Sequence, residues 1–170
     1  MAPGDEAEFA AFVAARSRAL LRTAFLLCGD WGQAEDLLQT ALGRTYLAWP
    51  RLRDRDRPEA YVRRVLATTH VDARRRFWHR ERATGTTPEP SGVDPYRTVD
   101  EWDALRRALL SLGPRQRAAV VLRYYDDLSV DEVAEVLGCA AGTVKSQSAR
   151  GLATLRAAMT GTDVGTEERA

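Results

Sequence analysis

A proline- and glycine-rich stretch in the middle of the chain limits what the rest can fold into. Residues 84–98 contain three prolines and two glycines with no apolar periodicity, which is typical of a linker. The stretch separates about 80 residues from about 60, and units of that size are near the lower limit for a self-sufficient core. The sequence therefore predicts domains at 5–82 and 101–158, a flexible linker at 83–100 and a disordered tail at 159–170.

The first unit has helical periodicity throughout. Its apolar residues keep to one face until Gly29 interrupts the run, then repeat at three- and four-residue steps up to Trp49. Pro50 is predicted to stop this second helix, residues 51–57 to form a charged loop, and Pro58 to open a third helix. No stretch of the chain alternates in the manner of a strand, so the predicted fold class is all-α.

The second unit contains the spacing of a helix-turn-helix. Gly113-Pro114 breaks and restarts the helical pattern, and Ser129 stands three residues before Glu132, as in a capping box. Gly138 suits the left-handed position that closes the short helix, and a longer helix follows. In this motif the second helix enters the major groove of DNA.

Charge favours nucleic acid as the partner of two segments. The whole chain has a net charge of +1, but residues 51–82 carry 11 basic and 5 acidic residues, or +6. The last predicted helix has no acidic residue from Cys139 to Ala158, which suits contact with phosphates. A solvated basic face, or a helical hairpin formed without any DNA role, would give some of the same signals.

Arginines and aromatic residues alternate near the end of the third predicted helix. Arg63, Arg64 and the run Arg74-Arg75-Arg76-Phe77-Trp78 combine cations with rings, which suits single-stranded nucleic acid. The alternative is structural: Phe77 continues the core stripe, and Trp78 then caps the domain. The polar face of the second helix carries Asp36, Gln39 and Thr40, and this pattern by itself indicates a solvated surface.

The residues that enzymes use are not arranged for catalysis. The chain has no glycine-rich phosphate loop, paired nucleophile or zinc-ligand spacing, so we expect no enzyme activity, no cofactor, no metal and no small-molecule substrate. Asp126-Asp127 precedes a capped helix, where its charge would favour the helix dipole. His70 is predicted to face the arginine-rich side of its helix, and Cys28 to be a small core residue.

Longer strings resemble a known family. Trp31-Gly-Gln-Ala-Glu-Asp-Leu-Leu-Gln-Thr-Ala and Pro58-Glu-Ala-Tyr-Val-Arg-Arg-Val resemble region 2 of the extracytoplasmic-function sigma factors. Leu112-Gly-Pro-Arg-Gln-Arg-Ala-Ala-Val-Val-Leu-Arg-Tyr and Gly142-Thr-Val-Lys-Ser resemble region 4. The resemblance implies a cytoplasmic subunit that binds the bacterial RNA polymerase core and directs it to promoter DNA. An anti-sigma factor that clamps both domains is a further candidate partner, and no membrane insertion is expected.

The resemblance also implies which residues carry each contact. The core-polymerase contact would use Asp36, Gln39 and Thr40. Recognition and melting of the −10 element would use Arg51, Arg53, Tyr61, Arg63, Arg64, Thr68, Arg74, Arg75, Arg76 and Trp78. Recognition of the −35 element would use Thr143, Lys145, Ser146, Gln147, Ala149 and Arg150. Two other functions stay open: a helix-turn-helix regulator that binds duplex DNA without polymerase, and an adaptor that has lost its DNA surfaces.

Overall fold

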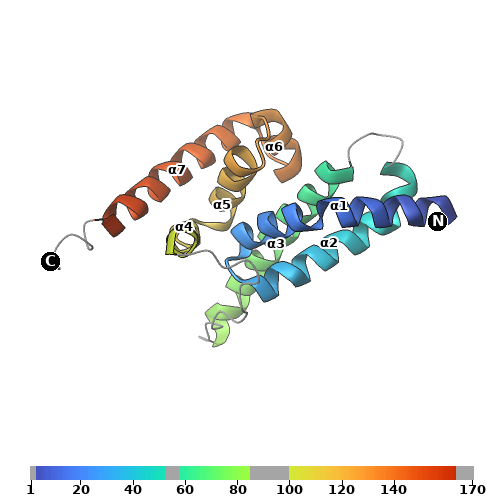
Figure 1. Ribbon diagram of the computed structural model, residues 1–170. Helices are drawn as coiled ribbons and strands as arrows, with labels where there is room; N and C mark the ends of the chain where they lie inside the picture. The colour runs from blue at the N-terminus through green and yellow to red at the C-terminus, as the bar shows by residue number, and fades with distance from the viewer. Residues whose placement is uncertain (1–2, 53–57, 85–99, 164–170) are drawn as a thin grey trace.

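The computed structural model describes residues 3–52, 58–84 and 100–163, without the side chains of 3, 75–84, 100–101 and 161–163. Every regular element in these ranges is helical, which confirms the all-α prediction. The elements are α1 (Pro3–Cys28), α2 (Trp31–Leu52), α3 (Pro58–Thr84), α4 (Asp100–Leu110), α5 (Pro114–Val120), the π-helical turn η2 (Val121–Tyr125), α6 (Val130–Leu137) and α7 (Ala141–Asp163). Figure 1 shows α1–α3 as one bundle and α4–α7 as a second group beside it.

The turn between α1 and α2 lies where the sequence predicts it. Gly29 adopts a φ of +76°, a left-handed conformation that glycine tolerates without strain, and α1 ends just before it. The carboxylate of Asp30 then accepts a hydrogen bond of 2.9 Å from the backbone N–H of Gln33. This bond satisfies one of the free donors at the start of α2.

The end of α2 corrects one prediction. The helix continues through Pro50 to Leu52, so Arg51 is helical and not part of a loop. A proline leaves one carbonyl unpaired, here that of Tyr46, and both residues are exposed, so water can hydrate that carbonyl. Residues 53–57, Arg53 among them, lie outside the described part of the chain. Pro58 opens α3, as predicted.

The second group contains the predicted capping box. Ser129 Oγ accepts a hydrogen bond of 3.1 Å from the N–H of Glu132, and Glu132 Oε2 accepts one of 2.8 Å from the N–H of Ser129. Gly138 closes α6 with a φ of +61°. Helix α7 continues to Asp163, five residues beyond the predicted domain limit at 158.

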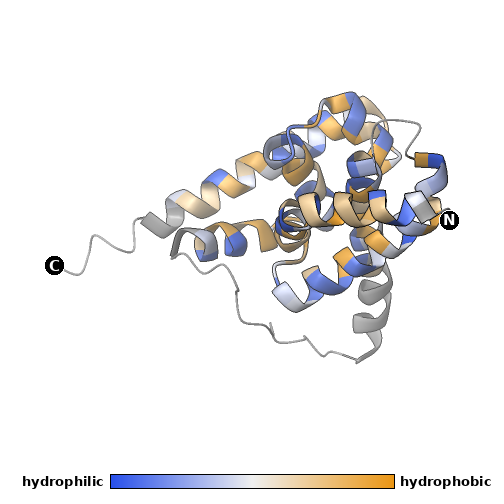
Figure 2. Cartoon of the chain, turned by 45° about the vertical axis from the view of Figure 1, so that its right-hand side comes forward, coloured by the Kyte–Doolittle hydropathy of each residue, from blue (hydrophilic) through white to orange (hydrophobic). Residues whose placement is uncertain are grey.

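The two groups share buried apolar surface. One cluster joins Leu20 and Leu27 of α1 and Leu66 of α3 to Leu109 of α4 and Val121 of η2. Each of these side chains is buried, and Figure 2 shows that the long helices carry both hydrophobic and hydrophilic residues. The groups therefore pack against each other through the apolar faces of amphipathic helices.

Candidate nucleic-acid interface

Helices α6 and α7 form a helix-turn-helix with a compact core. Val133 of α6 and Val144 of α7 are completely buried against each other's helices and against Leu122 of η2. The N–H groups of Thr143 and Val144 both bond the carbonyl of Ala140, which fixes the start of α7. This packing holds α7 at a defined angle to α6, as a groove-reading helix requires.

The outer face of α7 is polar and open to solvent. Thr143, Lys145, Ser146, Ala149 and Arg150 are all exposed, whereas Gln147 is half-buried. Ser148 lies on the inner face, where its hydroxyl donates to the carbonyl of Val144 over 2.7 Å. The six residues predicted to read the −35 element thus occupy one stretch of a single helix, with only Gln147 partly covered.

A glycine that the sequence analysis did not single out sets how closely α7 approaches α5. A Cβ atom at Gly151 would lie 2.7 Å from Cγ2 of Val120, which is shorter than side chains tolerate. Gly151 is buried in the described structure, so the two helices touch at this residue. The sequence feature that could have indicated this close approach is a lone glycine within a helical pattern.

The residues predicted to contact the −10 element are in different environments. Arg51 and Arg64 are exposed, whereas Tyr61, Thr68 and Arg74 are half-buried. Thr68 donates its hydroxyl to the carbonyl of Arg64 over 2.8 Å and so stays close to its own helix. The remaining predicted residues, whose side chains lie outside the described part of the chain, are Arg53, Arg75, Arg76 and Trp78.

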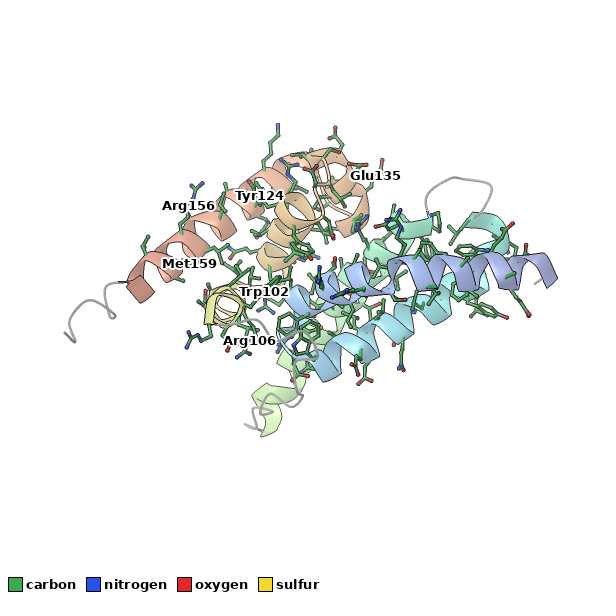
Figure 3. All side chains as sticks on the ribbon, viewed as in Figure 1. Trp102, Arg106, Tyr124, Glu135, Arg156 and Met159 are labelled. Carbon is green, nitrogen blue, oxygen red and sulfur yellow. The ribbon has the colours of Figure 1, made fainter. Side chains whose placement is uncertain are left out.

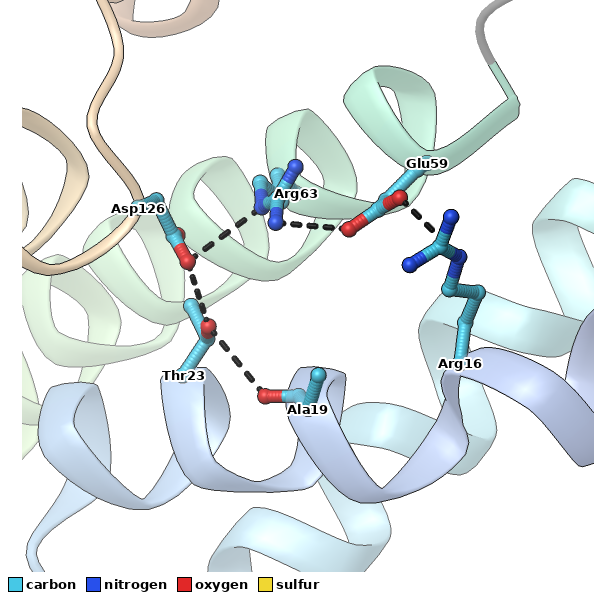
Figure 4. Close-up of polar contacts among 6 residues, drawn as sticks. All are labelled: Arg16, Ala19, Thr23, Glu59, Arg63 and Asp126. Atoms are coloured by element: carbon cyan, nitrogen blue, oxygen red, sulfur yellow. Dashed lines mark hydrogen bonds and ion pairs between the residues drawn. The ribbon is translucent and has the colours of Figure 1, made fainter.

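Arg63, which was predicted to contact DNA, is paired with acidic side chains in the structure. Its Nη2 lies 2.6 Å from Oε1 of Glu59, and its Nε lies 3.3 Å from Oδ1 of Asp126 in the second group (Figure 4). Thr23 of α1 donates a hydrogen bond of 2.9 Å to that same oxygen of Asp126. Asp126 therefore bridges the two groups and does not serve only the dipole of α6, the role predicted from its place before that helix.

Burial dominates the electrostatics of Asp126. Its side chain is 3% exposed, and desolvation raises its pKa above the usual value. The nearby Arg63 and the hydrogen bond from Thr23 oppose the increase in pKa, and the charge of Glu59 adds to it. The carboxylate is therefore held in a place that favours its neutral form.

A small cavity lies where α3 meets the helix-turn-helix. Thr68 and Asp72 of α3 line it from one side, and Thr143 and Gln147 of α7 line it from the other. Its volume is about 110 Å³. Residues predicted to read two separate promoter elements thus face each other across one gap.

The exposed face of α2 carries the residues predicted to contact the polymerase core. Asp36, Gln39 and Thr40 are exposed, and Thr40 donates its hydroxyl to the carbonyl of Asp36 over 2.9 Å. The opposite face is buried through Ala34, Leu37, Leu38 and Ala41. The predicted contact residues therefore point away from the bundle and are available to a partner.

Comparison with known proteins identifies the family. Residues 12–80 match the family described as sigma-70 region 2, and residues 102–155 match sigma-70 region 4. An RNA polymerase sigma-E factor of Streptomyces coelicolor is 39% identical over 165 residues, which span 95% of this chain and 91% of that protein. The ECF RNA polymerase sigma factor SigL of Mycobacterium tuberculosis is 35% identical over 135 residues, or 75% of each chain. The chain belongs to the extracytoplasmic-function sigma factors.

A solved structure shares the fold of this sigma factor. The sigma factor RpoE from Bartonella quintana, solved in complex with the anti-sigma factor NepR, aligns with a TM-score of 0.72 at 24% identity. The alignment covers 90% of this chain and 97% of that one. Helices α1–α3 therefore form region 2 and α4–α7 form region 4. Among the described residues, no helix is long and apolar enough to cross a membrane.

His70 and Cys28 form a buried pair in region 2. The side chain of His70 is buried, with Arg74 of the same helix nearby, and its Nδ1 lies 3.8 Å from Sγ of Cys28. Desolvation, with Arg117 and Arg74 nearby, lowers the pKa of His70 to about 3. Burial raises the pKa of Cys28 to about 12, so the thiol stays protonated and the prediction of a core cysteine is confirmed.

Arg117 is a second residue that the sequence analysis missed. Its guanidinium donates to the carbonyl of Leu109 over 2.8 Å and to that of Leu112 over 3.1 Å, both in region 4. It also donates over 2.7 Å to the carbonyl of Leu27 in region 2. Burial lowers the pKa of Arg117 to about 10, which leaves it charged at neutral pH. The sequence feature that could have indicated a buried role is the position of this arginine beside the apolar stripe of α5.

Proposed function

We propose that this chain binds the RNA polymerase core in the cytoplasm and directs promoter-specific initiation of transcription through −10 and −35 contacts. The observation that carries the proposal is the presence of both sigma-70 regions, in family order, on one chain. The acid-free, exposed face of α7 supports it independently, because a helix that enters the major groove must approach phosphates. Like other sigma factors, the chain would be an initiation factor and not an enzyme.

Helix α7 would read the −35 element from the major groove. Lys145 and Arg150 supply the cations, and Thr143, Ser146 and Ala149 are small enough to let the helix approach base edges closely. Arginine pairs with guanine through two hydrogen bonds and glutamine with adenine, so Arg150 and Gln147 are the proposed sequence readers.

The start of α3 and its basic continuation would act on the −10 element. Melting requires a base to leave the stack, which costs a few kcal/mol, so a pocket and cationic backbone contacts must offset that energy. Arg64 is exposed on α3 and Arg51 is exposed at the end of α2, so both are available to phosphates. The remaining residues predicted for the −10 element are Arg53, Tyr61, Arg63, Thr68, Arg74, Arg75, Arg76 and Trp78, and we propose the same role for them.

The exposed face of α2 would dock on the polymerase core. Asp36 and Gln39 offer a charge and an amide on one face, and Thr40 lies one turn after Asp36, with its hydroxyl bonded to the backbone carbonyl of Asp36. An anti-sigma factor is a further proposed partner, supported by the similar fold of the Bartonella quintana protein, which was solved with one. Polymerase would fix the spacing of the two DNA contacts and so raise their effective concentration.

Transcription in vitro tests the function directly. Pooled promoter fragments are transcribed with purified core polymerase, either alone or with this protein added. We expect discrete start sites that appear only with the protein and share two upstream elements. A protein that shifts free duplex DNA but yields no start sites would instead be a regulator. A protein that binds the core polymerase and does neither would be an adaptor.

A further inference from the structure

A wider cleft adjoins the small cavity between α3 and α7. Its volume is about 550 Å³, and Val71 and Asp72 of α3 line it together with Gln147 of α7. Residues 113–116, where α5 begins, complete its lining. Val71, Asp72, Arg115 and Gln147 line both the cleft and the small cavity. The two spaces therefore form one pocket with a wide mouth and a narrow inner end, in the size range of small-molecule sites.

The mouth of this pocket carries two opposite charges that the fold does not use. Asp72 lies on α3 and Arg115 on α5, and both residues are exposed. Neither side chain forms a hydrogen bond or ion pair with any residue in the described part of the chain. A cationic group of a ligand could bind Asp72, and a carboxylate could bind Arg115 through two parallel hydrogen bonds.

Two amides can supply the remaining polar contacts. Gln116 and Gln147 are half-buried in the lining of the pocket, and neither amide group bonds a residue that the structure describes. Because an amide group both donates and accepts hydrogen bonds, each can bind a polar ligand in either sense.

Apolar side chains close the inner end of the pocket. Leu137, Cys139 and Val144 line it, and Val144 is completely buried in the core of the helix-turn-helix. The hydroxyl of Thr68, which also lines this end, already donates to the carbonyl of Arg64. At about 110 Å³, the inner end has room for a compact apolar group, whose burial there would be favourable.

We propose that this pocket binds a small zwitterion, an α-amino acid with a compact apolar side chain. Its ammonium group would bind Asp72, its carboxylate would bind Arg115, and its side chain would enter the inner end beside Val144. A neutral molecule would leave both charges of the pocket unpaired, and a molecule with one charge would satisfy only one of them. A ligand with several negative charges would be repelled by the carboxylate of Asp72.

Binding would also affect the proposed −35 contact, and this consequence rests on the sigma-factor function given above. Thr143 and Gln147 line the pocket and belong to the surface that we propose to read the −35 element. A ligand that bonds Gln147 would occupy a side chain proposed to pair with a base, so the ligand and −35 DNA would weaken each other's binding. The concentration of one metabolite could then adjust promoter recognition.

Calorimetry on the full chain tests the site, with alanine, valine, leucine, isoleucine and methionine as probes. We expect at least one of them to bind with a Kd below about 1 mM. The tightest is then compared with the amine that lacks its carboxylate and the acid that lacks its ammonium group. Each analogue should bind at least about tenfold more weakly, because one charged contact is lost. No binding by any of the five, or equal binding of an amino acid and its analogues, would overturn the proposal.

Variants at the mouth locate the bound amino acid. Asp72→Asn and Arg115→Gln each remove one proposed charge contact and should weaken binding at least about tenfold. Glu135→Gln and Arg156→Gln change exposed positions outside the pocket, both labelled in Figure 3, and should leave binding unchanged. Equal effects of the mouth variants and these controls would place the ligand elsewhere and overturn the proposal.

A gel shift separates this inference from the proposed function. The probe is a −35 duplex taken from the start sites found by transcription in vitro. A saturating concentration of the amino acid should weaken the shift by the wild-type protein at least about fivefold, but not the shift by Arg115→Gln. An unchanged wild-type shift would refute the competition and leave the function intact. An absence of start sites without any amino acid would count against the function itself.

Discussion

The two helices that we propose to contact DNA differ in what surrounds them. Helix α7 presents Lys145, Ser146 and Arg150 to solvent, and its neighbours are on the opposite face. Helix α3 has Arg63 engaged by two carboxylates and Ala67 buried under region 4. The helix proposed to read the −35 element is therefore open to solvent, whereas the helix proposed to act on the −10 element is partly covered by region 4. The difference teaches that one fold can leave one proposed nucleic-acid surface exposed and bury part of another.

The largest effect should come from the residue that holds both regions. Arg117→Met removes hydrogen bonds to Leu109, Leu112 and Leu27 and leaves their carbonyls buried. We expect a loss of about 3–5 kcal/mol in the free energy of unfolding, measured by urea denaturation, because several hydrogen bonds from a charged donor are lost at about 1.5–3 kcal/mol each. Arg115→Met, at an exposed position of the same helix, is the matched control and should change the free energy by less than about 0.5 kcal/mol. Equal losses for the two variants would contradict this role of Arg117.

The next prediction tests whether α7 can bind the −35 element in the absence of polymerase. Arg150→Ala should weaken recognition of the −35 element by about 1–3 kcal/mol and broaden the promoter profile. Because Arg150 is exposed, the loss should appear both in gel shifts by the free protein and in transcription by the holoenzyme. Arg156→Ala, further along the exposed side of α7, controls for charge alone. An unchanged promoter profile for Arg150→Ala would show that this side chain reads no base.

The stability of the fold should depend on pH through His70, which is buried on α3. His70 has a pKa of about 3 in the fold and about 6.5 in the unfolded chain, so protonation favours unfolding. Its contribution to stability is complete above pH 6.5 and is lost as the pH falls toward 3. Between pH 7 and pH 5, we expect the wild-type protein to lose about 2 kcal/mol that His70→Gln does not lose. Parallel pH profiles of the two proteins would contradict the assignment.

Local signals predicted the helices and their ends well. The capping box at Ser129 and the left-handed Gly138 depend on residues three to nine apart, and the structure has both. Pro50 was misread because a proline stops a helix only where the freed carbonyl has no other partner, and exposure near a helix end supplies water. A rule based on sequence alone fails here because hydration of the unpaired carbonyl lets the helix continue through Pro50.

The junction between the regions could not be predicted from sequence patterns. Ala67 is one small residue among several on α3, and only its contact with region 4 distinguishes it. Asp126 has a sufficient local explanation beside a helix start, yet it reaches Thr23, 103 residues earlier. His70 contacts Cys28, which lies 42 residues earlier on α1. In each case the deciding partner lies outside the helix that carries the residue, so no periodicity reveals it.

The smallest expected effect concerns the charge of Asp126. Because burial raises its pKa, its contribution to stability is present below the unfolded value of 3.8 and is lost as the pH rises through the raised value. At pH 7, Asp126→Asn, which cannot ionise, should therefore raise the melting temperature slightly, by the equivalent of less than about 1 kcal/mol. Asp127→Asn removes the same charge one residue later, at an exposed position with a φ of +55° that asparagine tolerates.

The comparison of these two variants decides what holds α3 against region 4. Arg63 keeps its contact with Glu59 in Asp126→Asn, so no cation is left alone, and Thr23 can still donate to the asparagine oxygen. A higher melting temperature only for Asp126→Asn would assign the packing of region 4 on α3 to apolar contacts around Ala67 and show that the charge of the carboxylate opposes it. A clear decrease would mean that the attraction of Arg63 exceeds the burial penalty, so that the ion pair holds the regions together.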